Sequence, residues 1–237
     1  MSHKDQQAFI NFVANRFNLL GSEIVVVEIG SQDVNGRASD SFLLTNRSVW
    51  IGLDIGPGKN VDFVIPGELI QLPDSWADMA ISTECFEHTP KWREILINMI
   101  RITRPGGMIV LTFAGPGRRA HGTIDTKSIP SPYTTDYYRN VSLMELTHCI
   151  NLDKHFSHYS IEVNTAHSDT YFWGIRNDLL SESEWMPTEE ALARARGQLG
   201  KVIFENAILK KENARLRSKS LTLMLMKLTR KLGMNMK

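Results

Sequence analysis

The sequence predicts an α/β protein built on a doubly wound, Rossmann-like sheet. The apolar run over residues 24–29 suits a parallel strand that is buried on both faces. It leads into a turn that contains Gly30 and Gly36, and glycine lets the backbone turn sharply and approach a ligand closely. A strand, a glycine turn and a following helix form the nucleotide-binding half of such a sheet. A plain strand-to-helix turn is the alternative explanation of this segment alone.

Further segments extend the pattern. We expect strands near residues 49–53, 61–64, 78–82 and 108–113, and a final antiparallel pair, His158–Asn164 and Tyr171–Arg176. We expect helices over residues 4–20, 38–45, 92–103 and 143–149. The first helix would present an apolar stripe of Phe9, Phe12, Val13, Arg16 and Phe17. Ser142 and Glu145 have the spacing of a capping box. Residues 114–140 are rich in Gly and Pro, so we expect a long functional loop.

Each of the first two expected strands has an acid at its carboxyl end. Glu28 lies in the first strand, and Asp54 closes the second strand, 26 residues later. An acid at the end of the second strand hydrogen-bonds a ribose diol in folds of this kind. The turn is not the dinucleotide fingerprint G-x-G-x-x-G, because Gln32 stands at the second glycine position.

Two later motifs reveal a family resemblance. The segment from Ser82 reads S-x-x-x-x-E-H, and Arg104-Pro105-Gly106-Gly107 precedes the fifth strand. With the glycine turn, these motifs resemble class I S-adenosylmethionine (SAM)-dependent methyltransferases, most closely the type 11-like branch found in surface-glycan biosynthesis clusters. The resemblance covers roughly residues 24–178 and implies a seven-stranded sheet with an antiparallel last strand. The chain departs from the family's E-x-G-x-G-x-G at Gln32 and Val34, where contacts to the methionine part of SAM are affected.

The resemblance implies SAM as the cofactor. Glu28 would meet the methionine amino group, the glycine turn its carboxylate, and Asp54 the ribose. Glu68 would lie near the adenine amine, with the next residue against the ring. Each acid is alternatively a helix cap or a surface acid. The expected cofactor-binding residues are Glu28, Gly30, Ser31, Gly36, Asp54, Glu68, Leu69 and Ser82.

Two histidines are candidates for the catalytic base. An alcohol is a poor nucleophile until its proton leaves, so O-methylation benefits from a general base. His121 in the long loop is the first choice, and His88 is the second because the pKa of histidine lies near the working pH. A purely structural role is the alternative. We expect no metal, although Glu84, Glu87 and His88 form an alternative set for a hard ion such as Mg²⁺.

The long loop also carries the candidates for acceptor binding. It follows the carboxyl end of the fifth strand, where open sheets bind ligands. Its arginines would clamp a phosphate or carboxylate, and its tyrosines would stack on a sugar ring, unless they merely hold the loop in place. These residues are Arg118, Arg119, Tyr133, Tyr137, Tyr138 and Arg139.

Charge is distributed unevenly. Residues 201–237 contain ten Lys and Arg and two Glu, which leaves 17 basic and 24 acidic residues in the remainder. An acidic body argues against nucleic acid as a partner. We expect a catalytic domain over residues 1–180, a linker and coiled-coil helix over 181–219, and a basic amphipathic tail over 220–237.

A heptad pattern supports the coiled coil. Asn206 and Asn213 would occupy core positions, where asparagine favours two strands, so we expect a homodimer. A single helix packed on its own domain is the alternative. The tail would lie on a membrane or dock into a partner's groove, and a disordered or packed tail is the alternative.

Cysteine usage and hydropathy bear on location. Cys85 and Cys149 show no metal or disulfide spacing, so a reducing cytoplasm is expected. The first residues lack an apolar signal region, and no apolar run reaches the ~18 residues of a membrane span. We expect a cytoplasmic protein, peripheral at the inner face of the membrane where its tail anchors it.

These features favour a SAM-dependent O-methyltransferase that acts on a sugar hydroxyl of a surface polysaccharide or its nucleotide-sugar precursor. The tail would hold the enzyme in a membrane-associated glycan-assembly complex. One alternative is a methyltransferase for a quinone-like or lipid small molecule, with or without metal. A second alternative is a non-catalytic scaffold in which the coiled coil is the working part.

Overall fold

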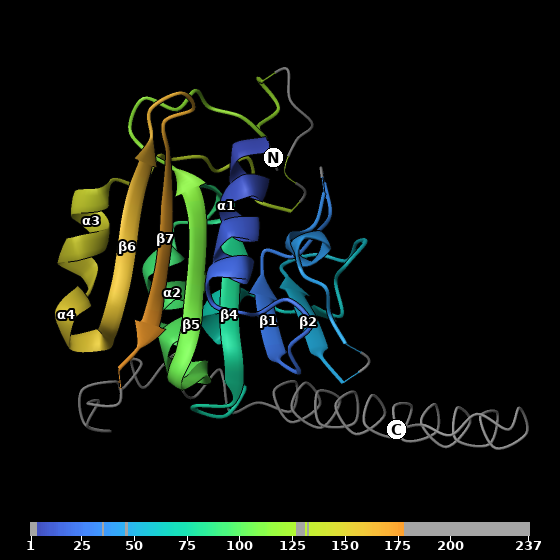
Figure 1. Ribbon diagram of the computed structural model, residues 1–237. Helices are drawn as coiled ribbons and strands as arrows, with labels where there is room; N and C mark the ends of the chain where they lie inside the picture. The colour runs from blue at the N-terminus through green and yellow to red at the C-terminus, as the bar shows by residue number, and fades with distance from the viewer. Residues whose placement is uncertain (1–3, 35, 46, 127–130, 132, 178–237) are drawn as a thin grey trace, which may run out of the picture.

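The computed structural model describes residues 4–34, 36–45, 47–126, 131 and 133–177. The strands in this part of the chain are β1 (Val25–Ile29), β2 (Val49–Asp54), β3 (Phe63–Val64), β4 (Ala77–Thr83), β5 (Thr103–Ala114), β6 (Phe156–Asn164) and β7 (Asp169–Arg176). They form one seven-stranded sheet in the order β3-β2-β1-β4-β5-β7-β6. The first five strands are parallel, and β7 is antiparallel to both of its neighbours. The predicted Rossmann-like sheet is confirmed (Figure 1).

Helices cover both faces of the sheet. They are α1 (Lys4–Arg16), α2 (Trp92–Ile102), α3 (Leu143–Cys149) and α4 (Leu152–His155), with short 3-10 turns η1 (Ala38–Ser41), η2 (Gly67–Leu69) and η3 (Phe86–His88). Side chains alternate between the faces of a strand. Val26 therefore packs in the core beneath α1, whereas Val25 and Val27 pack in the core that contains residues of α2 and α3. Figure 1 shows α1 in front of the sheet and α2 behind it.

The predicted helix over residues 38–45 is wrong. Only η1 forms there, and Phe42 is already extended, with φ −113° and ψ 130°. Phe42 is buried while Leu43 is 72% exposed, so the apolar residues of this segment do not share one helical face. Without an apolar stripe to bury, a short helix gains too little from packing to form.

The first helix is shorter than predicted. It ends at Arg16, and Asn18 adopts the left-handed conformation, with φ 54°, that commonly terminates helices. Its predicted stripe is also partly wrong, because Phe12 is 50% exposed. The buried positions are Gln6, Phe9, Ile10, Val13 and Ala14.

The capping box of α3 is confirmed. Ser142 Oγ accepts a hydrogen bond from the Glu145 backbone N–H at 3.1 Å, and the Glu145 carboxylate accepts one from the Ser142 N–H at 3.1 Å. Between β5 and α3, the described residues form a long loop without helix or strand, as predicted. Figure 1 shows this loop (green to yellow-green) at the end of the sheet where β5 ends.

The C-terminal predictions lie outside the described residues. This applies to the coiled-coil helix over residues 181–219, to the tail over 220–237 and to the domain boundary at residue 180. None of the helices that the structure describes combines the length and hydropathy needed to cross a bilayer.

Candidate active site

A cavity of about 450 Å³ opens beyond the carboxyl ends of β1, β2 and β4. Open parallel sheets bind their ligands at this edge. One end of the cavity is lined by the glycine turn and by the acids Glu28, Asp54 and Glu68. The other end is lined by Glu84, His88 and His121.

The glycine turn has a geometry that only glycine satisfies. Gly30 has φ 74°, and a Cβ built on it would lie 2.7 Å from both Cβ and Sγ of Cys85. The N–H groups of Gly30 and Ser31 both donate to the Leu53 carbonyl, at 2.9 and 3.1 Å, which closes the turn onto β2. Gly36, with φ 113°, lies beside the same cavity. Ser31 Oγ is buried with no hydrogen-bond partner among the described residues, and it lies beside β2, 2.7 Å from the position of a Cβ on Gly52.

Glu28 is a buried carboxylate in the cavity wall. Its Oε2 accepts hydrogen bonds from Trp50 Nε1 at 2.7 Å and from Asn60 Nδ2 at 3.1 Å. Burial raises the pKa of Glu28 to about 7, although both hydrogen bonds act in the opposite direction. A bound ammonium group would favour the ionised carboxylate, because opposite charges close together stabilise each other. A positively charged ligand group would therefore be stabilised at this position.

Asp54 faces the cavity from the end of β2. Its carboxylate accepts the Gln32 N–H at 3.0 Å and the Gly56 N–H at 3.4 Å. Burial raises the pKa of Asp54. Since Gln32 contributes its backbone N–H, the missing second glycine of the family motif leaves this contact intact.

Two predicted cofactor contacts lie elsewhere. Glu68 lines the cavity, but Leu69 packs against the hydrophobic core and is not part of the cavity wall. Ser82 is buried in β4, where its Oγ donates to the Ile29 carbonyl at 2.9 Å. A buried hydroxyl needs such a partner, and here the sheet itself supplies it.

The structure brings the two predicted histidines together. The rings of His88 and His121 have centroids 5.5 Å apart and are perpendicular, and the Tyr138 ring contacts both. Glu87 lies behind them, fully buried, with Oε1 3.6 Å from His121 Nε2. Burial by itself would raise the pKa of Glu87, but the nearby histidines lower it below its usual value. Burial lowers the pKa of His88.

Glu84 adds a second buried acid to this end of the cavity. It has φ 50°, a left-handed conformation that is strained for a side chain of this size. Burial and the charge of Glu87 raise its pKa to about 8. Its Oε1 accepts from Thr112 Oγ1, which in turn accepts from Gln6 Nε2, both at 2.9 Å. Gln6 and Thr112 were not among the predicted site residues; the position of Gln6 on the apolar face of α1 was the signal available in the sequence.

The predicted metal set is also corrected. Glu87, His88 and His121 each offer one possible ligand atom, and these atoms lie within 4.8 Å of one another. Glu84 is not a member of this group. The loop residue His121 takes its place because the chain folds back over η3.

Most of the predicted acceptor residues instead hold the loop in place. Arg118 forms an ion pair with the fully buried Asp169, at 3.3 Å, and Arg139 pairs with Glu145. These two arginines do not line the cavity. Their charges are thus largely balanced within the protein, and their role as phosphate clamps stays a prediction.

The loop's other polar residues divide into two groups. Tyr133 lines the cavity beside Gly56, where a Cβ on that glycine would lie 1.9 Å from the Tyr133 ring. Tyr138 donates its hydroxyl to the Arg119 carbonyl at 3.3 Å, and the Tyr137 carbonyl lies 3.4 Å from His88 Nδ1. Neither of these tyrosines lines the cavity, and the exposed Arg119 does not line it either.

The seven-stranded sheet and the cavity at its carboxyl edge are similar to those of SAM-dependent methyltransferases of class I. Residues 53–111 match the family described as a methyltransferase domain. Among curated proteins, no sequence matches the chain.

Solved structures show the same fold. Burkholderia thailandensis 1,6-didemethyltoxoflavin-N1-methyltransferase, solved with 1,6-didemethyltoxoflavin and S-adenosylhomocysteine, is 13% identical with a TM-score of 0.50, over 73% of this chain and 78% of that one. Haemonchus contortus phosphoethanolamine N-methyltransferase 2, solved with SAM, is 14% identical with a TM-score of 0.51, over 74% and 53%. The CurJ carbon methyltransferase is 14% identical with a TM-score of 0.50, over 73% and 55%. This chain therefore spans just over half of the last two proteins.

Proposed function

We propose that this protein is an O-methyltransferase that uses SAM to methylate a sugar hydroxyl of a surface polysaccharide or of its nucleotide-linked precursor. One observation carries the proposal: a single cavity is lined both by Glu28 and Asp54 and by His88 and His121. Methyl transfer needs donor and acceptor aligned in one space, and this cavity offers each of them a polar end.

The cofactor end carries polar groups that suit SAM. Glu28 would face the amino group, the backbone of the glycine turn at Gly30 and Ser31 the carboxylate, and Asp54 the ribose. Bound there, SAM supplies an electrophilic sulfonium methyl group, which leaves sulfur as the acceptor atom takes it.

The acceptor end provides a base for a hydroxyl. His121 Nδ1 lies 3.2 Å from the Arg119 carbonyl, which can only accept, so Nδ1 carries the hydrogen and Nε2 has a free lone pair. In the proposed step, the O–H bond of the acceptor breaks, its electron pair stays on oxygen, and the proton moves to Nε2. The resulting imidazolium would be stabilised by the Glu87 carboxylate, 3.6 Å away.

We propose oxygen as the acceptor atom because His121 can act as a general base. The similar structures include enzymes named for methylation at nitrogen and at carbon, so the fold does not select the acceptor atom. A neutral amine already has a nucleophilic lone pair, whereas a hydroxyl must lose its proton. The glycan acceptor is supported by the exposed ring of Tyr133 at the cavity rim and by the basic segment 201–237, which would attract an anionic, nucleotide-linked sugar.

Calorimetric titration with S-adenosylhomocysteine, with and without Mg²⁺, tests the cofactor end. Replacing Asp54 by Ala should weaken binding by about tenfold or more, because it removes a charged hydrogen-bond acceptor from the cavity wall. The matched control is Asp153→Ala, since that exposed carboxylate on α4 bonds Tyr159 instead. Equal affinities of the two variants would contradict the cofactor placement.

Turnover of His121→Ala tests the acceptor end. With nucleotide-sugars and oligosaccharides as acceptors, we expect the rate to fall by about 10²–10⁴-fold while affinity for S-adenosylhomocysteine stays close to wild type. His158→Ala, on an exposed position of β6, is the control. Methylation of quinols or lipids but of no carbohydrate would overturn the proposed acceptor class.

A further inference from the structure

The side chains of Glu87, His88 and His121 form a buried cluster at the acceptor end of the cavity. All three are less than 10% exposed, and they come from two segments that the fold brings together, η3 and the loop after β5. One ligand atom from each lies within 4.8 Å of the others.

The carboxylate of Glu87 has no adequate partner. It is 0% exposed, and neither of its oxygens has a hydrogen-bond partner among the described residues. The nearest ring nitrogen, His121 Nε2, lies 3.6 Å from Oε1, beyond hydrogen-bond distance. A fully buried carboxylate without a donor or a cation is costly, so this geometry calls for a positive charge between the two groups.

Both histidines are anchored in the same way. His88 Nδ1 lies 3.4 Å from the Tyr137 carbonyl, and His121 Nδ1 lies 3.2 Å from the Arg119 carbonyl. A carbonyl only accepts, so each Nδ1 carries its hydrogen and each Nε2 has a lone pair. The lone pair of His121 Nε2 has no partner among the described residues, whereas that of His88 Nε2 accepts from Ser131 Oγ at 3.2 Å, a hydroxyl that a bound ion would displace. Metal-binding histidines usually have this arrangement, in which the second ring nitrogen donates to a carbonyl or carboxylate. In His121 the free Nε2 lone pair faces a carboxylate oxygen, an arrangement that is repulsive without a cation.

We propose that Glu87, His88 and His121 bind one divalent transition-metal ion, with Zn²⁺ as the best match. Two imidazoles and one carboxylate suit Zn²⁺, whereas Mg²⁺ prefers oxygen ligands. Tetrahedral zinc with bonds near 2.1 Å places its ligand atoms about 3.4 Å apart. The 3.6 Å between His121 Nε2 and Glu87 Oε1 is close to that spacing.

Three protein ligands leave a fourth position of the ion open. Because His88 and His121 line the cavity, that position would face the acceptor. In the ion-free protein His121 Nε2 is the base proposed above; with the ion bound, Nε2 is a ligand, and the ion would take over its task by lowering the pKa of a bound hydroxyl. Only this last role rests on the proposed function; the metal site does not.

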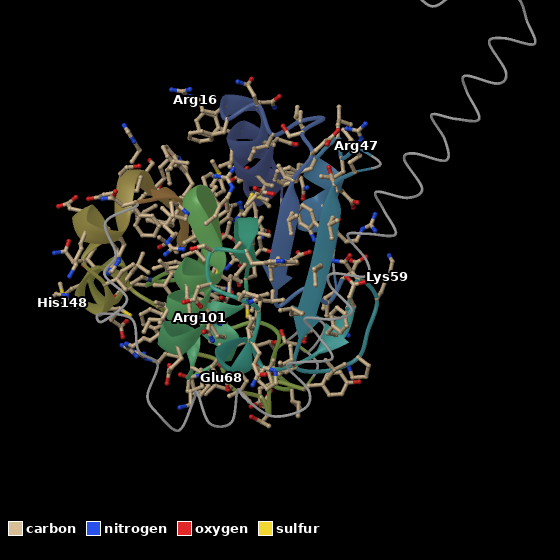
Figure 2. The ribbon with its side chains drawn as sticks, turned by 90° about the horizontal axis from the view of Figure 1, so that it is seen from below. Arg16, Arg47, Lys59, Glu68, Arg101 and His148 are labelled. Atoms are coloured by element: carbon tan, nitrogen blue, oxygen red, sulfur yellow. The ribbon has the colours of Figure 1, made fainter. Side chains whose placement is uncertain are left out.

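Titration of the full chain with Zn²⁺ after chelator treatment tests the site, with the visible absorption of bound Co²⁺ as a second readout. We expect one ion per chain and an affinity about tenfold or more weaker in both His121→Ala and Glu87→Gln. His148→Ala is the matched control, because His148 is exposed on α3 and points outward at the edge of the molecule (Figure 2). Unchanged binding of S-adenosylhomocysteine to each variant shows that it is folded.

Two results would overturn the proposal. One is wild-type protein that binds S-adenosylhomocysteine but takes up no Zn²⁺ or Co²⁺. The other is equal ion affinity in the His121→Ala, Glu87→Gln and His148→Ala variants. Ion binding that the first two substitutions abolish would support the metal site even if no hydroxyl acceptor were methylated, so the two proposals fail separately.

Discussion

Burial of Glu28 disfavours the ionised form of its carboxylate. Its carboxylate is buried, which raises its pKa from 4.5 to about 7. The native protein therefore binds more protons than the unfolded chain between these two values. It follows that the free energy of unfolding decreases as pH rises from about 4.5 to about 7, and the full cost is present above pH 7. The buried, ionised carboxylate thus destabilises the ligand-free protein, and a bound ammonium group would offset this effect.

Replacing Glu28 by Gln should make the ligand-free protein more stable at alkaline pH. At pH 8 we expect a gain in the free energy of unfolding on the order of 1–3 kcal/mol over wild type, and little gain at pH 4. The same variant should bind S-adenosylhomocysteine about tenfold more weakly. Urea unfolding at both pH values and calorimetry measure these effects.

The control for Glu28→Gln is Glu23→Gln. Glu23 forms an exposed ion pair with Arg47, and such pairs contribute little to stability. The interpretation fails if the stability difference between Glu28→Gln and wild type is the same at pH 4 and pH 8.

Some site residues could be predicted from the sequence because local structure places them. Glu28 and Asp54 lie at the carboxyl ends of adjacent strands, and that position brings both to one cavity. The predicted site residues that lie away from the cavity have partners that are distant in the sequence. Arg118 pairs with Asp169, and Ser82 bonds the Ile29 carbonyl across the sheet. Nothing in the neighbouring sequence indicates these contacts.

Among the secondary-structure elements, α2 positions one wall of the cavity. Asn98 Nδ2 donates to the carbonyls of Gly67 and Glu68, at 3.1 and 2.9 Å. One turn further along, Arg101 donates to the carbonyls of Ile70 and Leu72, both at 2.7 Å. The loop that contains Glu68 has few backbone partners of its own, so the helix satisfies its carbonyl groups and fixes its path.

Asn98→Ala should therefore affect both stability and binding. Loss of the buried donor leaves two carbonyl groups unsatisfied, so we expect a decrease of about 1–3 kcal/mol in the free energy of unfolding. Affinity for S-adenosylhomocysteine should also fall, because Gly67 and Glu68 line the cavity. Thermal unfolding and calorimetry provide the two readouts.

Ser142→Ala is the matched control at this scale. It removes the capping box of α3, which should cost about 1 kcal/mol, but it touches no residue of the cavity wall. If both variants lose affinity equally, the effect of Asn98 reflects general destabilisation and not the positioning of η2.

Helices and strands could be predicted where interactions within a short segment determine its conformation. The apolar strands and the capping box of α3 are examples, because alternation, burial and the cap all act within a few residues. Residues 38–45 have a helix-compatible composition, but Phe42 packs against Trp50 from β2. This tertiary contact stabilises the extended conformation of Phe42 over the helical one.

At the scale of the whole molecule, the cavity belongs to the first part of the chain. The described residues that line it lie between Gln6 and Thr135, and the last described strand ends at Arg176. Charge is distributed unevenly along the chain. Residues 201–237 carry ten of the 27 Lys and Arg but only two of the 26 Asp and Glu. Cofactor binding and association are thus expected to reside in different parts of the chain.

Deletion of residues 188–237 should separate these two properties. The shortened chain keeps all of the strands and cavity-lining residues that the structure describes, so we expect it to fold and to bind S-adenosylhomocysteine with an affinity close to that of the full chain. Because the predicted coiled coil is removed, it should be a monomer, whereas the full chain should be a dimer. Light scattering after gel filtration and calorimetry measure the two outcomes. A fragment that remains dimeric would refute the coiled-coil prediction, and a monomer that binds no S-adenosylhomocysteine would show that the C-terminal segment contributes to the site.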